Sequence, residues 1–116
     1  MTQISLRPIG LLALLTAGAT ALSATPQAFA ETAVLAEGRG LVEANCGNCH
    51  GVGEADASPH EAAPPFRNLS DSFPIDALEE AFADGRIYSG HPDMPEFIAT
   101  PQQVDAIIAY IASLQE

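Results

Sequence analysis

Two cysteines and a histidine lie within five consecutive residues, Cys46-Gly47-Asn48-Cys49-His50. Two thiols three positions apart on a helical turn can each add to one of the two vinyl groups on a haem edge, and the next residue then presents its imidazole to the iron. Gly47 and Asn48 leave room for the porphyrin. We therefore predict a haem attached covalently through Cys46 and Cys49, with His50 as the proximal iron ligand.

Three other interpretations of the two cysteines compete with haem attachment. A disulfide, half of a zinc site and a thioredoxin-like redox pair each explain the thiols but give His50 no role. A zinc site would need a second pair of ligands at similar spacing, and the chain has no other cysteine. A thioredoxin-like motif opens a helix within a βαβ pattern, and no alternation typical of strands is visible.

The N-terminus has the layout of a secretory signal peptide. Its short first segment has one basic residue, Arg7, and is followed by an uncharged apolar run over residues 9–22 and a small-residue triplet at 28–30. We predict that residues 1–30 are a signal peptide that is cleaved after Ala30, which places the mature protein in the periplasm. A retained membrane anchor is the weaker interpretation, because the run is shorter than the roughly 20 apolar residues of a spanning helix.

Residues 31–116 are predicted to form one small, acidic, monomeric domain. The whole chain has 15 Asp and Glu residues against 4 Lys and Arg, for a formal net charge of −11. Such a surface repels nucleic acid and favours a protein partner with a basic docking face, although acidity can also serve solubility alone. A domain this small without tryptophan buries little surface, so a covalent porphyrin fits as part of its core.

The sequence predicts helices and no strands, which indicates an all-α fold. At the C-terminus, Thr100 supplies an N-cap hydroxyl, Pro101 takes the first helical position, and Gln103 completes a capping box. The apolar stripe that follows consists of Val104, Ile107, Ile108, Ile111 and Leu114.

Two further helices are predicted. One extends from Leu35 to Asn45 and runs into the CxxCH motif, and Gly38 within it indicates close approach of another backbone. The other is followed by Gly85 as a stop and has its apolar residues at helical spacing, at Ile75, Leu78, Ala81 and Phe82.

Two irregular stretches separate these helices. Residues 51–69 are rich in Gly, Ala, Ser, Asp and Pro, and they read as a loop long enough to wrap a ligand. The second stretch holds Met94 between Pro92 and Pro95, which fix the backbone. Methionine usually serves as a flexible core filler, so a methionine in a rigid loop indicates a specific role.

With these features in this order, residues 35–115 resemble a class I c-type cytochrome of the small soluble bacterial kind. In that family, a glycine and an apolar residue on the N-terminal helix cross an aliphatic residue and a tyrosine on the C-terminal helix. Gly38 and Val42 match the first pair, and Ile107 and Tyr110 match the second. The resemblance implies an all-α cytochrome c fold whose N- and C-terminal helices cross and whose loops wrap one covalently bound haem c.

The resemblance also implies roles for the two irregular stretches. Residues 63–66 look like the segment whose proline carbonyl accepts the Nδ1 hydrogen of the haem histidine, and Pro64 fits that position. Residues 93–97 look like the distal loop, with Met94 as the sixth iron ligand. No residue clearly matches the tyrosine that contacts this methionine in the family, and Tyr88 is the nearest candidate.

Three side chains compete for the distal position on the iron. Met94 is favoured by its rigid setting and by the His/Met pairing typical of cytochromes c. His91 would require the loop to turn the other way, and His60 is expected within the polar loop. Arg67 has two equal interpretations, contact with a haem propionate or a surface ion pair with Asp71.

These observations predict a monohaem electron carrier that exchanges single electrons with redox partner proteins by outer-sphere transfer, and not an enzyme. Two filled axial positions leave little room for a substrate on the iron. One alternative is a cytochrome subunit of a larger oxidoreductase complex. The other is a five-coordinate haem enzyme or sensor.

Overall fold

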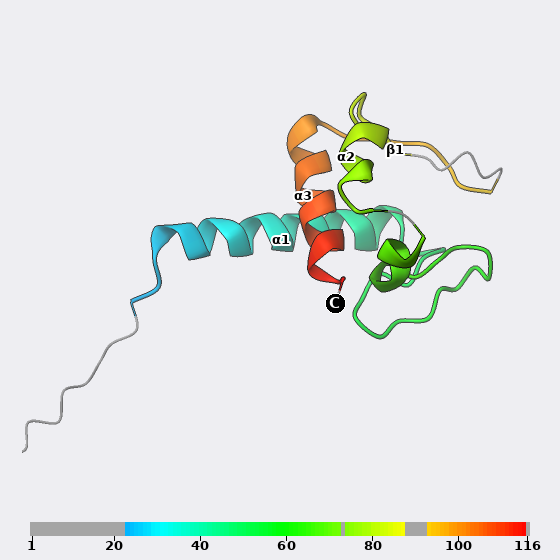
Figure 1. The fold of residues 1–116 in the computed structure, drawn as a ribbon, viewed down its shortest axis with the longest axis horizontal. Coiled ribbons are helices and arrows are strands. Elements are labelled where there is room, and N and C mark those ends of the chain that lie inside the picture. The colour runs from blue at the N-terminus through cyan, green and yellow to red at the C-terminus, as the bar shows by residue number, and fades with distance from the viewer. Residues whose placement is uncertain (1–22, 73, 88–92, 116) are drawn as a thin grey trace, which may run out of the picture.

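The computed structural model describes residues 23–72, 74–87 and 93–115, and within these ranges the chain is mainly helical (Figure 1). The elements in order are helix α1 (Pro26–Asn45), the 3-10 helix η1 (Phe66–Asp71), helix α2 (Ala77–Ala81), strands β1 (Arg86–Ile87) and β2 (Phe97–Ile98), and helix α3 (Pro101–Ser113). The predicted all-α class is confirmed. Within the described ranges, no helix is long and apolar enough to cross a membrane.

Helix α1 begins earlier than predicted, at Pro26 rather than Leu35. Proline at the first helical position has its φ already suited to the helix and needs no N–H partner there. Every side chain from residue 23 to 34 is exposed, and this half of the helix projects away from the rest of the fold (Figure 1). The early turns were missed because they have no buried face and therefore no apolar periodicity.

Helices α1 and α3 cross at Gly38, as the resemblance implied (Figure 1). Gly38 lies directly on the carbonyl of Ala106, and a Cβ added to it would be 2.7 Å from that carbonyl carbon and 2.9 Å from Tyr110 Cβ. Val42, one turn further along α1, is fully buried, and Ile107 is buried in the same core. Only a glycine permits this approach of the two backbones.

Helix α3 starts with the predicted capping box. The Gln103 N–H donates to the Thr100 hydroxyl at 3.3 Å, and the Thr100 N–H donates to Gln103 Oε1 at 2.9 Å. The stripe that follows is buried throughout, as predicted, at Val104, Ile107, Ile108, Ile111 and Leu114.

A short antiparallel ladder, which the sequence did not predict, follows helix α2. Gly85 ends the α2 segment with φ of 79°, as expected of a glycine stop. Strands β1 and β2 then pair, with Ile87 opposite Phe97, and the Ala99 N–H donates to the Gly85 carbonyl at 2.8 Å. Strands of two residues are too short to show alternation. The ladder closes the base of the loop that contains Met94.

Candidate haem site

The CxxCH motif forms a helical turn at the end of α1. The N–H groups of Cys49 and His50 both donate to the Cys46 carbonyl, at 3.1 and 2.9 Å. Both thiols are free, and Cys46 packs against the core. The α1–α3 crossing therefore sets the position of this turn, because α1 continues directly into it.

The imidazole of His50 is held by a backbone carbonyl. Its Nδ1 lies 2.8 Å from the Pro64 carbonyl oxygen, which is the contact that the resemblance implied. A carbonyl can only accept, so Nδ1 has the hydrogen and Nε2 is the nitrogen available to a metal. The ring also lies against Phe66, with the ring centroids 4.9 Å apart and the planes tilted by 42°.

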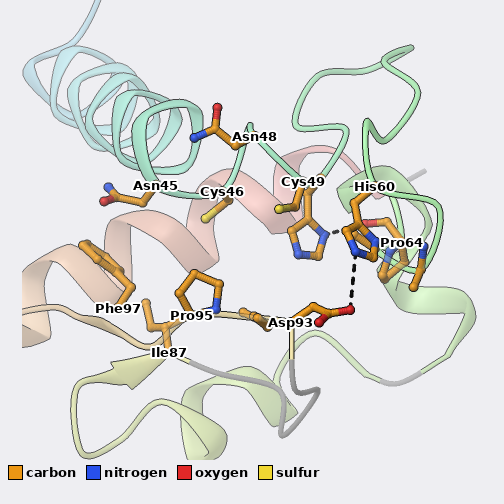
Figure 2. Close-up of a pocket in the computed structure, with 14 residues that line it drawn as sticks. Asn45, Cys46, Asn48, Cys49, His60, Pro64, Ile87, Asp93, Pro95 and Phe97 are labelled. Carbon is orange, nitrogen blue, oxygen red and sulfur yellow. Dashed lines mark hydrogen bonds and ion pairs between the residues drawn. The ribbon is translucent and has the colours of Figure 1, made fainter.

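The motif opens onto a cleft that contains about 890 Å³ of space free of protein atoms, part of it open to solvent. The structure brings all five predicted site residues together around this cleft: Cys46, Cys49, His50, Pro64 and Met94. Figure 2 shows the two cysteines on one wall and Ile87, Pro95 and Phe97 across from them. Such a largely apolar, concave site is typical of cofactor binding.

Met94 enters the cleft from the loop that the β1–β2 ladder closes. Its side chain is partly buried and packs against the core. Its neighbours Asp93 and Pro95 lie across the cleft from the cysteines (Figure 2). The thioether and the His50 imidazole thus line one cleft from two different segments.

His60, the candidate distal ligand expected within the polar loop, also lines the cleft. Its Nε2 lies 3.6 Å from Asp93 Oδ2, and its Nδ1 accepts the Ala62 N–H at 3.1 Å (Figure 2). The contact links the loop after the motif to the Met94 loop. Both ring nitrogens of His60 therefore have partners within the protein. His91 and Tyr88 lie outside the described residues.

The structure does not support two of the competing interpretations, the thioredoxin-like redox pair and the zinc site. Burial, with a smaller contribution from Cys49 beside it, raises the pKa of the Cys46 thiol to about 11. A thioredoxin-like nucleophile needs a lowered thiol pKa instead. In the part of the chain that the structure describes, no group of three or more His, Cys, Asp and Glu side chains is arranged to hold a metal ion, as a zinc site would require.

The expected ion pair between Arg67 and Asp71 is not formed, and contact of Arg67 with a haem propionate stays a prediction. Its guanidinium donates to the backbone carbonyl of Asp56 and does not line the cleft. The Asp71 carboxylate accepts instead from the Asn68 side chain at 3.2 Å. Helix η1, which contains Arg67, directs this side chain to the loop that follows the motif, a placement with no local sequence signal.

The geometry agrees with a comparison to protein families, in which the family model described as Cytochrome c matches residues 35–115. The chain belongs to the cytochrome c family. This family of haem-binding electron carriers holds haem c covalently, and Cys46 and Cys49 of this cytochrome fit its CxxCH motif. Comparisons with curated proteins and with solved structures gave no match.

The described residues fit a bound haem. They offer two free thiols on one turn, an imidazole with Nδ1 already engaged, and a thioether in the same cleft. These groups are of the kinds that hold haem in c-type cytochromes.

Proposed function

We propose that this cytochrome is a periplasmic monohaem electron carrier, with Cys46 and Cys49 as the haem thioethers and with His50 and Met94 as the axial ligands. One observation supports this proposal above the others. An imidazole whose Nδ1 is committed to the Pro64 carbonyl shares a cleft with a thioether from a distant segment.

Each residue then has a defined role. Bound haem supplies an iron that changes oxidation state by one electron. The cysteines keep the cofactor attached, and Pro64 holds the His50 ring and raises its basicity. Met94, paired with a histidine, raises the reduction potential. The apolar wall formed by residues such as Ile87 and Phe97 limits access of water, which further tunes the potential. With His50 and Met94 both holding the iron, the protein would exchange electrons without binding a substrate there.

Export is proposed with cleavage of residues 1–30 after Ala30. The buried residues of α1, Gly38 and Val42, both follow this point, and residues 23–34 are exposed. Cleavage would shorten α1 without removing any part of the core. The mature protein in a periplasmic extract should begin at Glu31, and its intact mass should include one haem. A mature chain that retains residue 1 would contradict the proposal.

The charge distribution supports a partner with a basic docking face. Arg39 pairs with Glu43 at 2.7 Å, and Arg86 lies 3.5 Å from Glu96 and 3.8 Å from Asp84. Arg67 donates to the Asp56 carbonyl, so each arginine of the described chain already has a partner. The large excess of carboxylates is therefore left uncompensated. A free carrier bound by such charges should leave its partner at high ionic strength, whereas a complex subunit should stay bound.

The axial ligands are tested by absorption spectroscopy of the haem-loaded protein. The ferric form should be low-spin and show the near-infrared charge-transfer band of methionine sulfur. Met94→Ala should lose this band, while the matched cleft variant His60→Ala and the variant His91→Ala should keep it. A high-spin ferric spectrum of the unaltered protein would contradict the proposal and favour a five-coordinate haem enzyme or sensor.

A further inference from the structure

The side chain of Gln115 connects the end of α3 to η1. Its Nε2 donates to the Phe66 carbonyl at 2.7 Å and to the Ile111 carbonyl at 2.8 Å, and its Oε1 accepts the Ser70 N–H at 3.0 Å. One partly buried amide therefore engages both ends of η1 and the last turn of α3. No motif in the sequence marked this residue.

The Phe66 backbone is also bonded to the haem-binding motif. Its N–H donates to the Gly51 carbonyl at 2.8 Å, beside the 2.8 Å contact between His50 Nδ1 and the Pro64 carbonyl. The Phe66 ring in addition packs against the His50 ring. The segment from Pro64 to Phe66 thus meets His50-Gly51 at three points, so a displacement of Phe66 would displace the acceptor of the histidine hydrogen.

Helix α3 anchors both sides of this arrangement. On the motif side, the buried Tyr110 hydroxyl donates to the Val52 carbonyl at 2.8 Å. On the other side, Gln115 holds the Phe66 carbonyl. The helix therefore sets the separation between the His50 ring and the carbonyl that accepts from it.

We propose that Gln115 is a positioning residue that sets the strength of the hydrogen bond from His50 Nδ1 to the Pro64 carbonyl, and through it the reduction potential. The inference rests on the proposed function, because it takes His50 as the proximal ligand. A strong bond at Nδ1 makes the imidazole a better electron donor, which stabilises the ferric state. Loss of the Gln115 contacts should loosen Pro64, weaken that bond and raise the potential.

The test uses the haem-loaded protein with Gln115→Leu, which has a similar size and no hydrogen-bonding groups. Gln115→Glu is a second variant, because it keeps an acceptor for Ser70 but has no donor for Phe66. Gln103→Ala is the matched control, since it removes a capping glutamine from the opposite end of α3. The readouts are the reduction potential and, by NMR of the reduced protein, the exchange rate of the His50 Nδ1 hydrogen with solvent.

Gln115→Leu should raise the potential, and both Gln115 variants should speed this exchange several-fold. Gln103→Ala should lower the unfolding midpoint and leave both readouts unchanged. The inference is overturned if the Gln115 variants lower only the unfolding midpoint, or if Gln103→Ala shifts the readouts equally. The exchange readout depends on His50 and not on Met94. Absence of the methionine charge-transfer band from the spectrum of the unaltered protein would therefore refute Met94 as a ligand without deciding the role of Gln115.

Discussion

A methyl group at Gly38 would force α1 and α3 apart. In Gly38→Ala the new carbon would lie 2.7 Å from the Ala106 carbonyl carbon and 2.9 Å from Tyr110 Cβ, closer still to the Ala106 oxygen. Non-bonded carbons prefer separations of about 3.5–4.0 Å, so the helices would have to separate by nearly an ångström. The obstacle is largely backbone, which cannot rotate aside as a side chain can.

The expected cost follows from this geometry. Overpacking of a tightly packed contact lowers the unfolding free energy by about 1–3 kcal/mol. A clash with backbone belongs in the upper part of that range, at about 2–3 kcal/mol. Alanine in place of glycine also raises the stability of the helix by roughly 0.5–1 kcal/mol, because alanine has the higher helix propensity. The control is Gly40→Ala on the same helix, where an added Cβ meets nothing within 4 Å. Because both variants share the propensity gain, their difference in unfolding free energy isolates the clash.

Thermal and urea unfolding of the haem-loaded proteins measure this difference. Gly40→Ala should be slightly more stable than the unaltered protein, and Gly38→Ala clearly less stable. For a domain of this size 1 kcal/mol shifts Tm by about 4–8 °C, so the two variants should melt roughly 8–24 °C apart. Equal Tm values for Gly38→Ala and Gly40→Ala would refute the close crossing and, with it, the way in which α1 positions the CxxCH turn.

Three further predictions concern other parts of the molecule. Tyr110→Phe leaves the buried Val52 carbonyl without its donor and should lower the unfolding free energy by about 1–2 kcal/mol in urea titrations. Burial raises the pKa of Tyr110, so this residue stabilises the fold below about pH 10, and that stabilisation is lost at higher pH because the unfolded tyrosine ionises first. Tyr110→Phe should reduce this alkaline loss of stability. An unchanged pH profile of the unfolding free energy would argue against this role of Tyr110. Replacing both Cys46 and Cys49 with alanine should abolish the covalently bound haem that is seen on a denaturing gel, while either single variant should only weaken attachment. Haem that stays covalently bound in the double variant would exclude these thiols as the attachment points. Finally, electron exchange with a basic redox protein should slow as ionic strength rises, and a rate independent of salt would leave the acidic surface a role in solubility alone.

Local chemistry made several features predictable. The thiols and imidazole of the CxxCH motif lie within one helical turn, so their spacing alone indicates haem attachment. The capping box at Thr100 and Gln103 and the glycine stop at Gly85 likewise depend on residues close in sequence. The structure contains the helical turn of the motif, the capping box and the glycine stop. The contact between His50 and Pro64 spans a longer stretch, and only the resemblance to a known family indicated it.

Other features depend on contacts that no local pattern encodes. The two-residue strands β1 and β2 form because the segments on either side of the Met94 loop meet. Arg67 donates to the Asp56 carbonyl instead of pairing with the Asp71 carboxylate. The early start of α1 was equally hidden, since exposed helical turns need no apolar face.

The sequence was thus enough to predict the haem-attachment motif, because the motif is defined by its residue types and their immediate neighbours. How the loops around this motif are held became visible only in the folded molecule. The contacts of His60 with Asp93 and of Gln115 with Phe66 each join residues far apart along the chain. Their geometry depends on how the helices and loops pack as a whole, and spacing along a sequence contains no record of that packing.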